Sequence, residues 1–158
     1  MLLDRLTATG GSFAGEPGVF ELALPADPTS AGAARRSLAA YCRDQNAPAE
    51  LTQDALLVIS ELVTNAVLHA CTPAIAWAEY DAGAITVAVV DGSASLPSLL
   101  APSARRESGR GVAIIDELGA TWGLIRTSLG KIIWVNIRQG AGSQVPPPRP
   151  GGVDSTFT

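Results

Sequence analysis

The sequence has few of the residues that mark several classes of protein. Its 158 residues include two cysteines, Cys42 and Cys71, and one histidine, His69, so neither a zinc site nor a disulfide framework is indicated. We expect both thiols to be free and buried. No apolar run approaches the roughly 18 residues of a membrane-spanning helix, and Asp4 interrupts the N-terminal segment before a signal peptide could form. These absences predict a soluble, cytoplasmic protein that does not associate with a membrane.

Positive charge is also scarce. Lys and Arg together number 11 against 15 Asp and Glu, and the net charge of −4 has the wrong sign for a domain that coats a phosphate backbone. Charged residues make up 16% of the chain and apolar residues 47%, which is sufficient for a hydrophobic core. A chain of this length fits one domain. We therefore expect a single globular domain that does not bind nucleic acid.

Glycine and proline are concentrated at the two ends of the chain. Residues 1–18 contain several glycines and no apolar periodicity, which predicts a flexible leader. Residues 140–158 consist largely of Gly, Pro and Ser, which predicts a disordered tail. The folded domain is accordingly expected within residues 19–139.

The apolar pattern between these ends predicts alternating strands and helices. Ser30 is expected to cap a first helix that ends before the break at Asn46–Pro48, and a second helix is expected from about Pro48 to His69. Residues 91–109 have no regular pattern and are typical of a lid or binding loop. A short helix is expected at 112–118, and the expected strands are 20–24, 74–80, 85–90, 121–126 and 131–137. Antiparallel hairpins with helices on one face predict an α+β fold, a two-layer sandwich.

The second helix carries polar residues beside its apolar face. That face is formed by Ala55, Leu56, Ile59, Leu62, Val63, Ala66, Val67 and Ala70 and is expected to pack on the sheet. Glu61, Asn65 and His69 follow one another at four-residue spacing along its border with solvent. A carboxylate can accept a hydroxyl proton, and an amide oxygen is a hard ligand suited to Mg²⁺. The alternative is that all three are ordinary surface residues, with His69 capping the helix end.

Gly109-Arg110-Gly111 is the candidate for a phosphate-binding segment that remains after the familiar motifs fail. The chain has no GxxxxGK[ST] sequence, which excludes a P-loop, and Ala113 and Ile114 break the dinucleotide-binding pattern. Glycine amides at the N-terminus of a helix can nevertheless bind a phosphate, because the helix dipole favours negative charge there. The alternative is that the glycines only form a turn.

Asp91 stands at the end of an apolar strand, immediately before Gly92. A carboxylate in that place can accept a hydrogen bond from the exocyclic amine of adenine, while Gly92 leaves room for the ring. An ordinary Asp-Gly turn is the alternative.

Three segments in this order resemble the conserved boxes of the GHKL ATP-binding superfamily of gyrase, histidine kinases and MutL. They are ELVTNAVLHA (Glu61–Ala70), VVDGSASLP (Val89–Pro97) and ESGRGVAIIDELGATWG (Glu107–Gly123). With its short length and closing G-K-x-x-W strand, the chain is most similar to the anti-sigma-factor serine/threonine kinases of GC-rich, actinobacterial-type bacteria. The similarity extends over about Val19–Arg138 and implies a Bergerat-type ATP-binding fold. The usual D-x-G-x-G sequence appears here as D-G-S-A-S.

The resemblance implies specific roles for the matching residues. Glu61 corresponds to the general base, Asn65 to the Mg²⁺ ligand and Asp91 to the carboxylate that binds adenine. The implied nucleotide-binding set is Asn65, Asp91, Gly92, Gly109, Arg110, Gly111, Val112 and Lys131.

The resemblance also implies a function. Such a protein uses ATP and Mg²⁺ to phosphorylate a Ser or Thr on a small anti-sigma-factor antagonist and sequesters a sigma factor, and a homodimer is expected by analogy. The alternative is a non-catalytic ATP-binding module that sequesters a protein partner. Phosphotransfer to histidine is disfavoured because His69 is the only histidine in the sequence.

Overall fold

The computed structural model describes residues 17–93, 118, 120–128 and 130–140. In this part of the chain, strand β1 (Val19–Leu24) precedes helices α2 (Ser30–Asp44) and α3 (Ala49–Thr64), and α3 continues into a π-helical turn, η1 (Asn65–His69). Strands β2 (Ala74–Asp81), β3 (Ala84–Asp91), β4 (Thr121–Thr127) and β5 (Gly130–Arg138) follow. Each strand matches its expected range to within one residue at either end.

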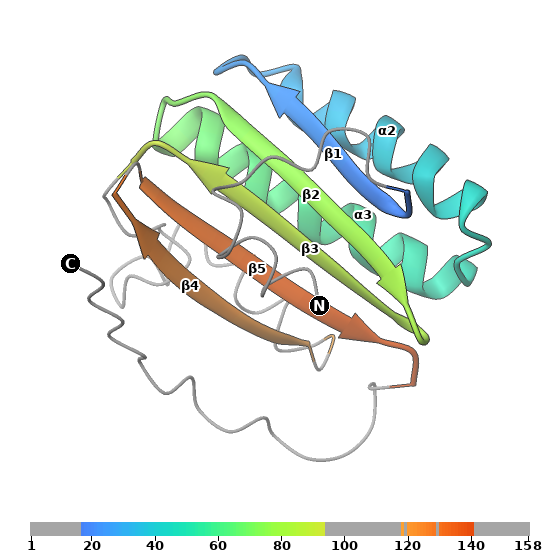
Figure 1. Cartoon of the computed structure of the whole chain (residues 1–158). Coiled ribbons are helices and arrows are strands. Elements are labelled where there is room, and N and C mark those ends of the chain that lie inside the picture. The colour runs from blue at the N-terminus through green and yellow to red at the C-terminus, as the bar shows by residue number, and fades with distance from the viewer. Residues whose placement is uncertain (1–16, 94–117, 119, 129, 141–158) are drawn as a thin grey trace.

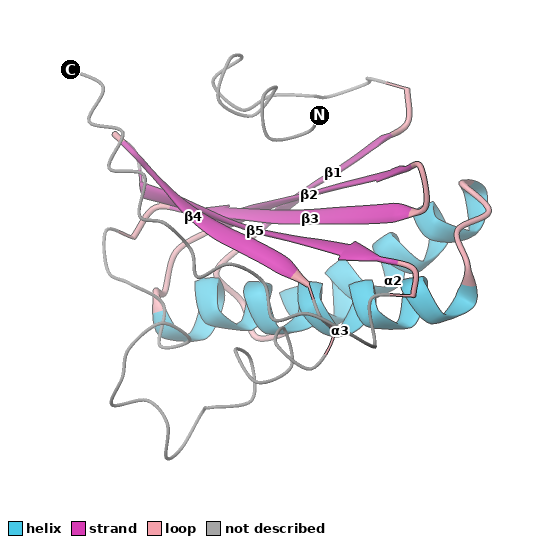
Figure 2. Cartoon of the chain, turned by 90° about the horizontal axis from the view of Figure 1, so that it is seen from below, coloured by secondary structure: helices cyan, strands magenta, loops and turns pink. Residues whose placement is uncertain are grey.

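The described strands form one five-stranded sheet in the order β1-β2-β3-β5-β4, and all neighbouring strands are antiparallel. Both helices lie on one face of this sheet (Figures 1 and 2). The predicted α+β two-layer sandwich is therefore confirmed. Residues 112–117 of the expected helix, residues 94–109 of the expected lid and the outer parts of both chain ends lie outside the described residues.

The apolar face of α3 and η1 packs on the sheet. Of the eight residues expected on that face, Leu56 and Ala70 are half-buried and the other six are buried. Burial of this stripe removes apolar surface from water and provides the main stabilisation of the two layers. By length and composition alone, the stretch Ala49–Leu68 could cross a membrane, but half of it is buried inside the fold, as in a core helix.

The last turn of this long helix differs from the expectation of a regular α-helix up to His69. The N–H of Ala70 donates to the carbonyl of Asn65 at 3.0 Å, an i→i+5 bond that defines a π turn. Cys71 then leaves the helix with a φ of +53°. The π turn begins at one of the residues expected to carry chemistry, Asn65.

Two smaller expectations were wrong. Ser30 does not cap α2, because its hydroxyl donates to the carbonyl of Pro25 at 2.8 Å, while Asp27 accepts the backbone N–H of Thr29 at 2.7 Å and thereby turns the chain into the helix. Cys71 is exposed rather than buried, because the backbone reversal after η1 carries it out of the core. Cys42 is buried as expected, and burial raises the pKa of its thiol.

Candidate functional site

One end of the sheet brings together most of the described candidate residues. β3 ends at Asp91 and β5 begins at Gly130-Lys131, and the antiparallel register places Asp91 directly opposite Lys131. Val89 and Ile133, two residues further into each strand, belong to the core between the sheet and the helices. Because strand side chains alternate between faces, Asp91 and Lys131 also point towards the helices. We call residues 72, 91–93 and 130–131 the site end of the sheet.

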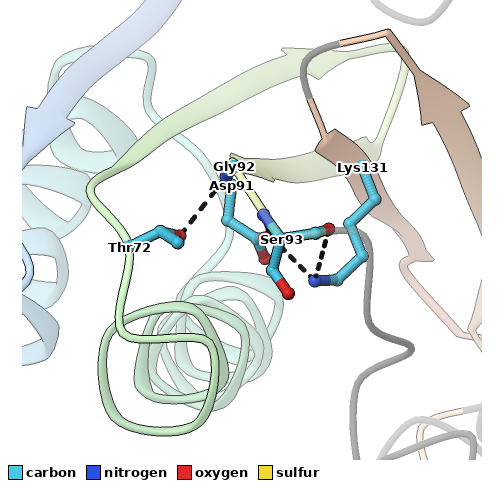
Figure 3. Close-up of polar contacts among 5 residues, drawn as sticks. All are labelled: Thr72, Asp91, Gly92, Ser93 and Lys131. Atoms are coloured by element: carbon cyan, nitrogen blue, oxygen red, sulfur yellow. Dashed lines mark hydrogen bonds and ion pairs between the residues drawn. The ribbon is translucent and has the colours of Figure 1, made fainter.

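A buried ion pair lies at the centre of the site end. The ammonium group of Lys131 donates to Oδ1 of Asp91 at 2.8 Å, and the two side chains are only 4% and 5% exposed. The same carboxylate oxygen accepts the backbone N–H of Ser93 at 2.9 Å, and Lys131 also donates to the carbonyl of Ser93 at 3.3 Å (Figure 3). Among the described residues, every contact of this carboxylate falls on Oδ1. Oδ2 is therefore the atom left to accept a hydrogen bond from a ligand.

Gly130 makes this ion pair possible. Its φ is +150°, and a Cβ atom at this position would lie 1.9 Å from the carbonyl oxygen of Asp91 and 2.9 Å from the Cα of Gly92. Only glycine lets the two backbones approach so closely. The start of β5 is thereby held against the end of β3, which sets Lys131 beside Asp91. The Gly-Lys sequence after a turn was the available signal, but it did not reveal the partner of Lys131.

Thr72 connects the helix layer to the site end. Its hydroxyl accepts the N–H of Gly92 at 3.3 Å, and its own N–H donates to the carbonyl of Ala66 in η1 at 3.4 Å (Figure 3 shows the first contact). The segment that leaves the π turn is thus hydrogen-bonded to the residue after Asp91. Sequence reasoning did not single out Thr72.

Asn65 opens the π turn and is buried, with 9% of its surface exposed, instead of lying at the border with solvent as expected. Its side-chain Nδ2 has no hydrogen-bond partner among the described residues. A buried donor without a partner typically costs about 1–3 kcal/mol. η1 packs against β3, the strand that ends in Asp91. The unpaired amide is therefore a candidate contact for a bound group.

Glu61 lies one helical turn before Asn65, and its carbonyl accepts the N–H of Asn65. Its side chain is partly exposed. No hydrogen bond or ion pair to its carboxylate exists among the described residues. The backbone of His69 belongs to η1.

The donor set fits a metal ion that is held jointly with phosphate. Within the described ranges, no group of three or more His, Cys, Asp or Glu side chains is placed to hold a metal. Mg²⁺ in nucleotide sites usually takes one or two protein oxygens and completes its shell with phosphate oxygens and water. The amide of Asn65 suits that arrangement, because its oxygen can ligate the metal while its unpaired N–H donates to a phosphate oxygen.

Some predicted site residues lie outside the described residues. These are Gly109, Arg110, Gly111 and Val112, expected on the phosphate side. Gly92 is described and exposed, and it lies directly beside Asp91. The described residues thus place the base-side candidates Asp91, Gly92 and Lys131 together, next to the turn that carries Asn65.

In this α+β domain, a sheet end with a buried carboxylate lies beside a helix end with a buried unpaired amide. The family model described as Histidine kinase-like ATPase domain matches residues 24–137, well over half of the chain. The chain belongs to this family, within the GHKL superfamily, and is an ATP-binding domain of the kinase-like type. A comparison with curated proteins found no match.

Proposed function

We propose that the chain is an anti-sigma-factor-type serine/threonine kinase that acts in the cytoplasm. It uses MgATP to phosphorylate a serine or threonine of a small antagonist protein, and it sequesters a sigma factor when the antagonist is modified or absent. A homodimer is part of this proposal. The observation that carries the proposal is the unpaired buried amide of Asn65, one turn after Glu61 and beside the strand that ends in Asp91.

In this proposal, different described residues have different roles in phosphoryl transfer. Asp91 binds the adenine amine, and Asn65 provides an amide oxygen for Mg²⁺ alongside the phosphate oxygens. Bound Mg²⁺ supplies charge neutralisation at the phosphates. The substrate hydroxyl oxygen forms a bond to the γ-phosphorus, its proton passes to the carboxylate of Glu61, and the bond to the bridging oxygen of ADP breaks. Most of the catalysis in such transfer comes from positioning and electrostatic stabilisation, so a small set of residues is sufficient.

A second candidate is a non-catalytic ATP-binding module that sequesters a partner. The observation that favours it is the isolation of Glu61. A general base is usually held by a third group, and none of the described residues holds this carboxylate. ATP then serves as a structural ligand.

Glu61→Gln distinguishes the two candidates. The substitution keeps the size of the side chain and removes its basicity, and a general base typically contributes 10²- to 10⁴-fold. With γ-labelled ATP and a panel of candidate antagonists, we expect phosphate transfer to slow by at least about 10²-fold, while affinities for ATP and the antagonist stay at wild-type values. Glu50→Gln, in the exposed first turn of α3, is the matched control and should transfer at the wild-type rate.

Wild-type transfer by a folded Glu61→Gln protein would refute the catalytic role. A wild-type protein that binds ATP but transfers phosphate to no antagonist favours the module. Mass spectrometry of the labelled residue tests the preference for Ser or Thr over His.

Co-purification from the native host tests the partners. A sigma factor or a small antagonist in the recovered complex supports the proposal. Recovery of a membrane receptor in their place would overturn it.

A further inference from the structure

The buried lysine at the site end has no explanation in adenine binding by a carboxylate alone. Asp91 can accept a hydrogen bond from an amine without help, and removing a lysine from water is unfavourable unless its charge and its donors are used. Lys131 is nevertheless 4% exposed, and it is the single lysine of the chain. The burial of Lys131 beside Asp91 therefore suggests that the lysine itself takes part in binding.

The hydrogen bonds of the pair leave one acceptor and one donor. Lysine carries three N–H donors and no acceptor. Two donors of Lys131 are directed to Oδ1 of Asp91 and to the carbonyl of Ser93. Oδ1 also accepts the N–H of Ser93, so two donors hold the carboxylate in one orientation. Among the described residues, Oδ2 of Asp91 and the third N–H of Lys131 have no partner, and they belong to side chains in direct contact.

We propose that Asp91 and Lys131 bind the base edge together, and that Lys131 is a specificity-determining residue of the site. Oδ2 accepts from the exocyclic amine of adenine, and the third N–H of Lys131 donates to the adjacent ring nitrogen, N1. This inference rests on the proposed ATP binding and extends it to the recognition of the base.

The chemistry of the pair favours adenine over guanine and hypoxanthine. Adenine presents a donor, its amine, next to an acceptor, N1. Guanine and hypoxanthine present the reverse order, a carbonyl oxygen next to an N–H. A carboxylate only accepts and an ammonium group only donates, so the pair cannot exchange roles to fit guanine or hypoxanthine. A site built in this way rejects the wrong base, because its buried groups would be left unpaired.

Two analogues of ATP test the contact to N1 in the full-length wild-type protein. In 1-deaza-ATP a C–H group replaces N1 and the amine is kept, whereas 3-deaza-ATP carries the same change at a nitrogen away from this edge. Isothermal titration calorimetry in Mg²⁺ should show that 1-deaza-ATP binds at least about tenfold more weakly than ATP, the loss typical of a hydrogen bond to a charged group. 3-deaza-ATP should bind nearly as well as ATP.

Lys131→Met assigns the effect to the lysine. The variant should bind ATP and 1-deaza-ATP with equal affinity, because the donor to N1 is absent. Arg138→Met, at the far end of the same strand, is the matched control and should keep the wild-type discrimination. If Lys131→Met does not fold, the comparison of the two analogues in the wild-type protein still tests the contact to N1.

The outcomes separate this inference from the proposed function. Tight ATP binding with no difference between ATP and 1-deaza-ATP would overturn the inference and leave ATP binding intact. Discrimination that persists in a folded Lys131→Met protein would overturn it as well. Failure of the wild type to bind ATP would overturn the proposed function, and the inference with it.

Discussion

At one end of the sheet β2 turns into β3, whereas at the other end β3 stops beside a π turn and a buried ion pair. The first end, which we call the hairpin end (residues 81–84 and 138–139), turns through Ala82 and Gly83 at positive φ values of +48° and +75°, as in a type I′ turn. The backbone N–H of Gln139 there donates to the carbonyl of Gly83. At the site end a charge pair is buried, and in the neighbouring π turn the side-chain amide N–H of Asn65 is unpaired. The glycine of the hairpin end follows local turn rules and Ala82 carries some backbone strain there, whereas a buried charge and an unpaired buried donor are found only around the site end among the described residues.

Of the variants that compare the two ends of the sheet, Asp91→Ala is expected to lower the free energy of unfolding the most. The change leaves the ammonium group of Lys131 buried without its counter-charge, and breaking such a pair typically costs about 3–5 kcal/mol. Asp81→Ala, in an exposed position of the hairpin end, should change the free energy of unfolding by less than about 0.5 kcal/mol. Denaturant unfolding followed by circular dichroism measures both.

The double variant Asp91→Leu/Lys131→Met is the internal check on that prediction. It removes both charges, so we expect it to recover most of the stability that Asp91→Ala loses. Equal losses for Asp91→Ala and Asp81→Ala would show that the two ends do not differ.

Two glycines provide the next comparison. Alanine at Gly130 would bring its Cβ to 1.9 Å from the carbonyl of Asp91, so the strands must separate, and we expect a loss on the order of 3 kcal/mol. Gly83 has a φ of +75° and open space around a Cβ, so Gly83→Ala should cost about 1 kcal/mol of backbone strain. Thermal unfolding of the two variants tests the order, and a greater loss at Gly83 would contradict it.

Asn65→Leu is expected to stabilise the ligand-free protein and to abolish the effect of Mg²⁺ on ATP binding. The free energy of unfolding without ligand should increase by about 1 kcal/mol, because the buried unpaired N–H is removed. The Mg²⁺-dependent part of ATP affinity should disappear, so that titrations in Mg²⁺ and in EDTA give the same affinity. Gln53→Leu, at an exposed position of α3, is a control that should keep the Mg²⁺ dependence. An equal loss of ATP affinity in both conditions would remove Asn65 from the metal site.

The smallest effect is expected from deletion of residues 140–158. This segment follows the end of β5 at the hairpin end, where Arg138 pairs with Ala84. Its sequence offers little apolar surface, so the stability should change by less than about 0.5 kcal/mol and ATP affinity should stay the same. A fall of several degrees in Tm would show that the segment packs on the domain.

The sequence predicted the parts of the fold that depend on local periodicity. The strands and the buried face of α3 follow alternating and helical patterns that are visible in short windows. The π turn escaped prediction because one extra residue at the end of a helix barely alters such a pattern. The Ser30 cap was wrong because Asp27 competes for the same turn.

The candidate site was predictable residue by residue but not as an arrangement. Asp91 was expected from its place at the end of a strand, and Lys131 from a resemblance. Their contact joins residues 40 positions apart and depends on the close approach at Gly130, which no local pattern reveals.

The strand order also has a consequence for folding kinetics. β1, β2 and β3 are neighbours in one part of the sheet and β4 with β5 form the other, and the two parts join along β3 and β5. This joint, like the pairing of β1 with β2, requires closure of a long loop of chain, which has an entropic cost. A nucleotide that binds both Asp91 in β3 and Lys131 in β5 would stabilise the pairing of these two strands. Because both residues come together only in the native state, the nucleotide would stabilise the native state relative to the unfolded state. ATP should therefore slow global unfolding and protect the domain from proteolysis as its concentration rises above Kd.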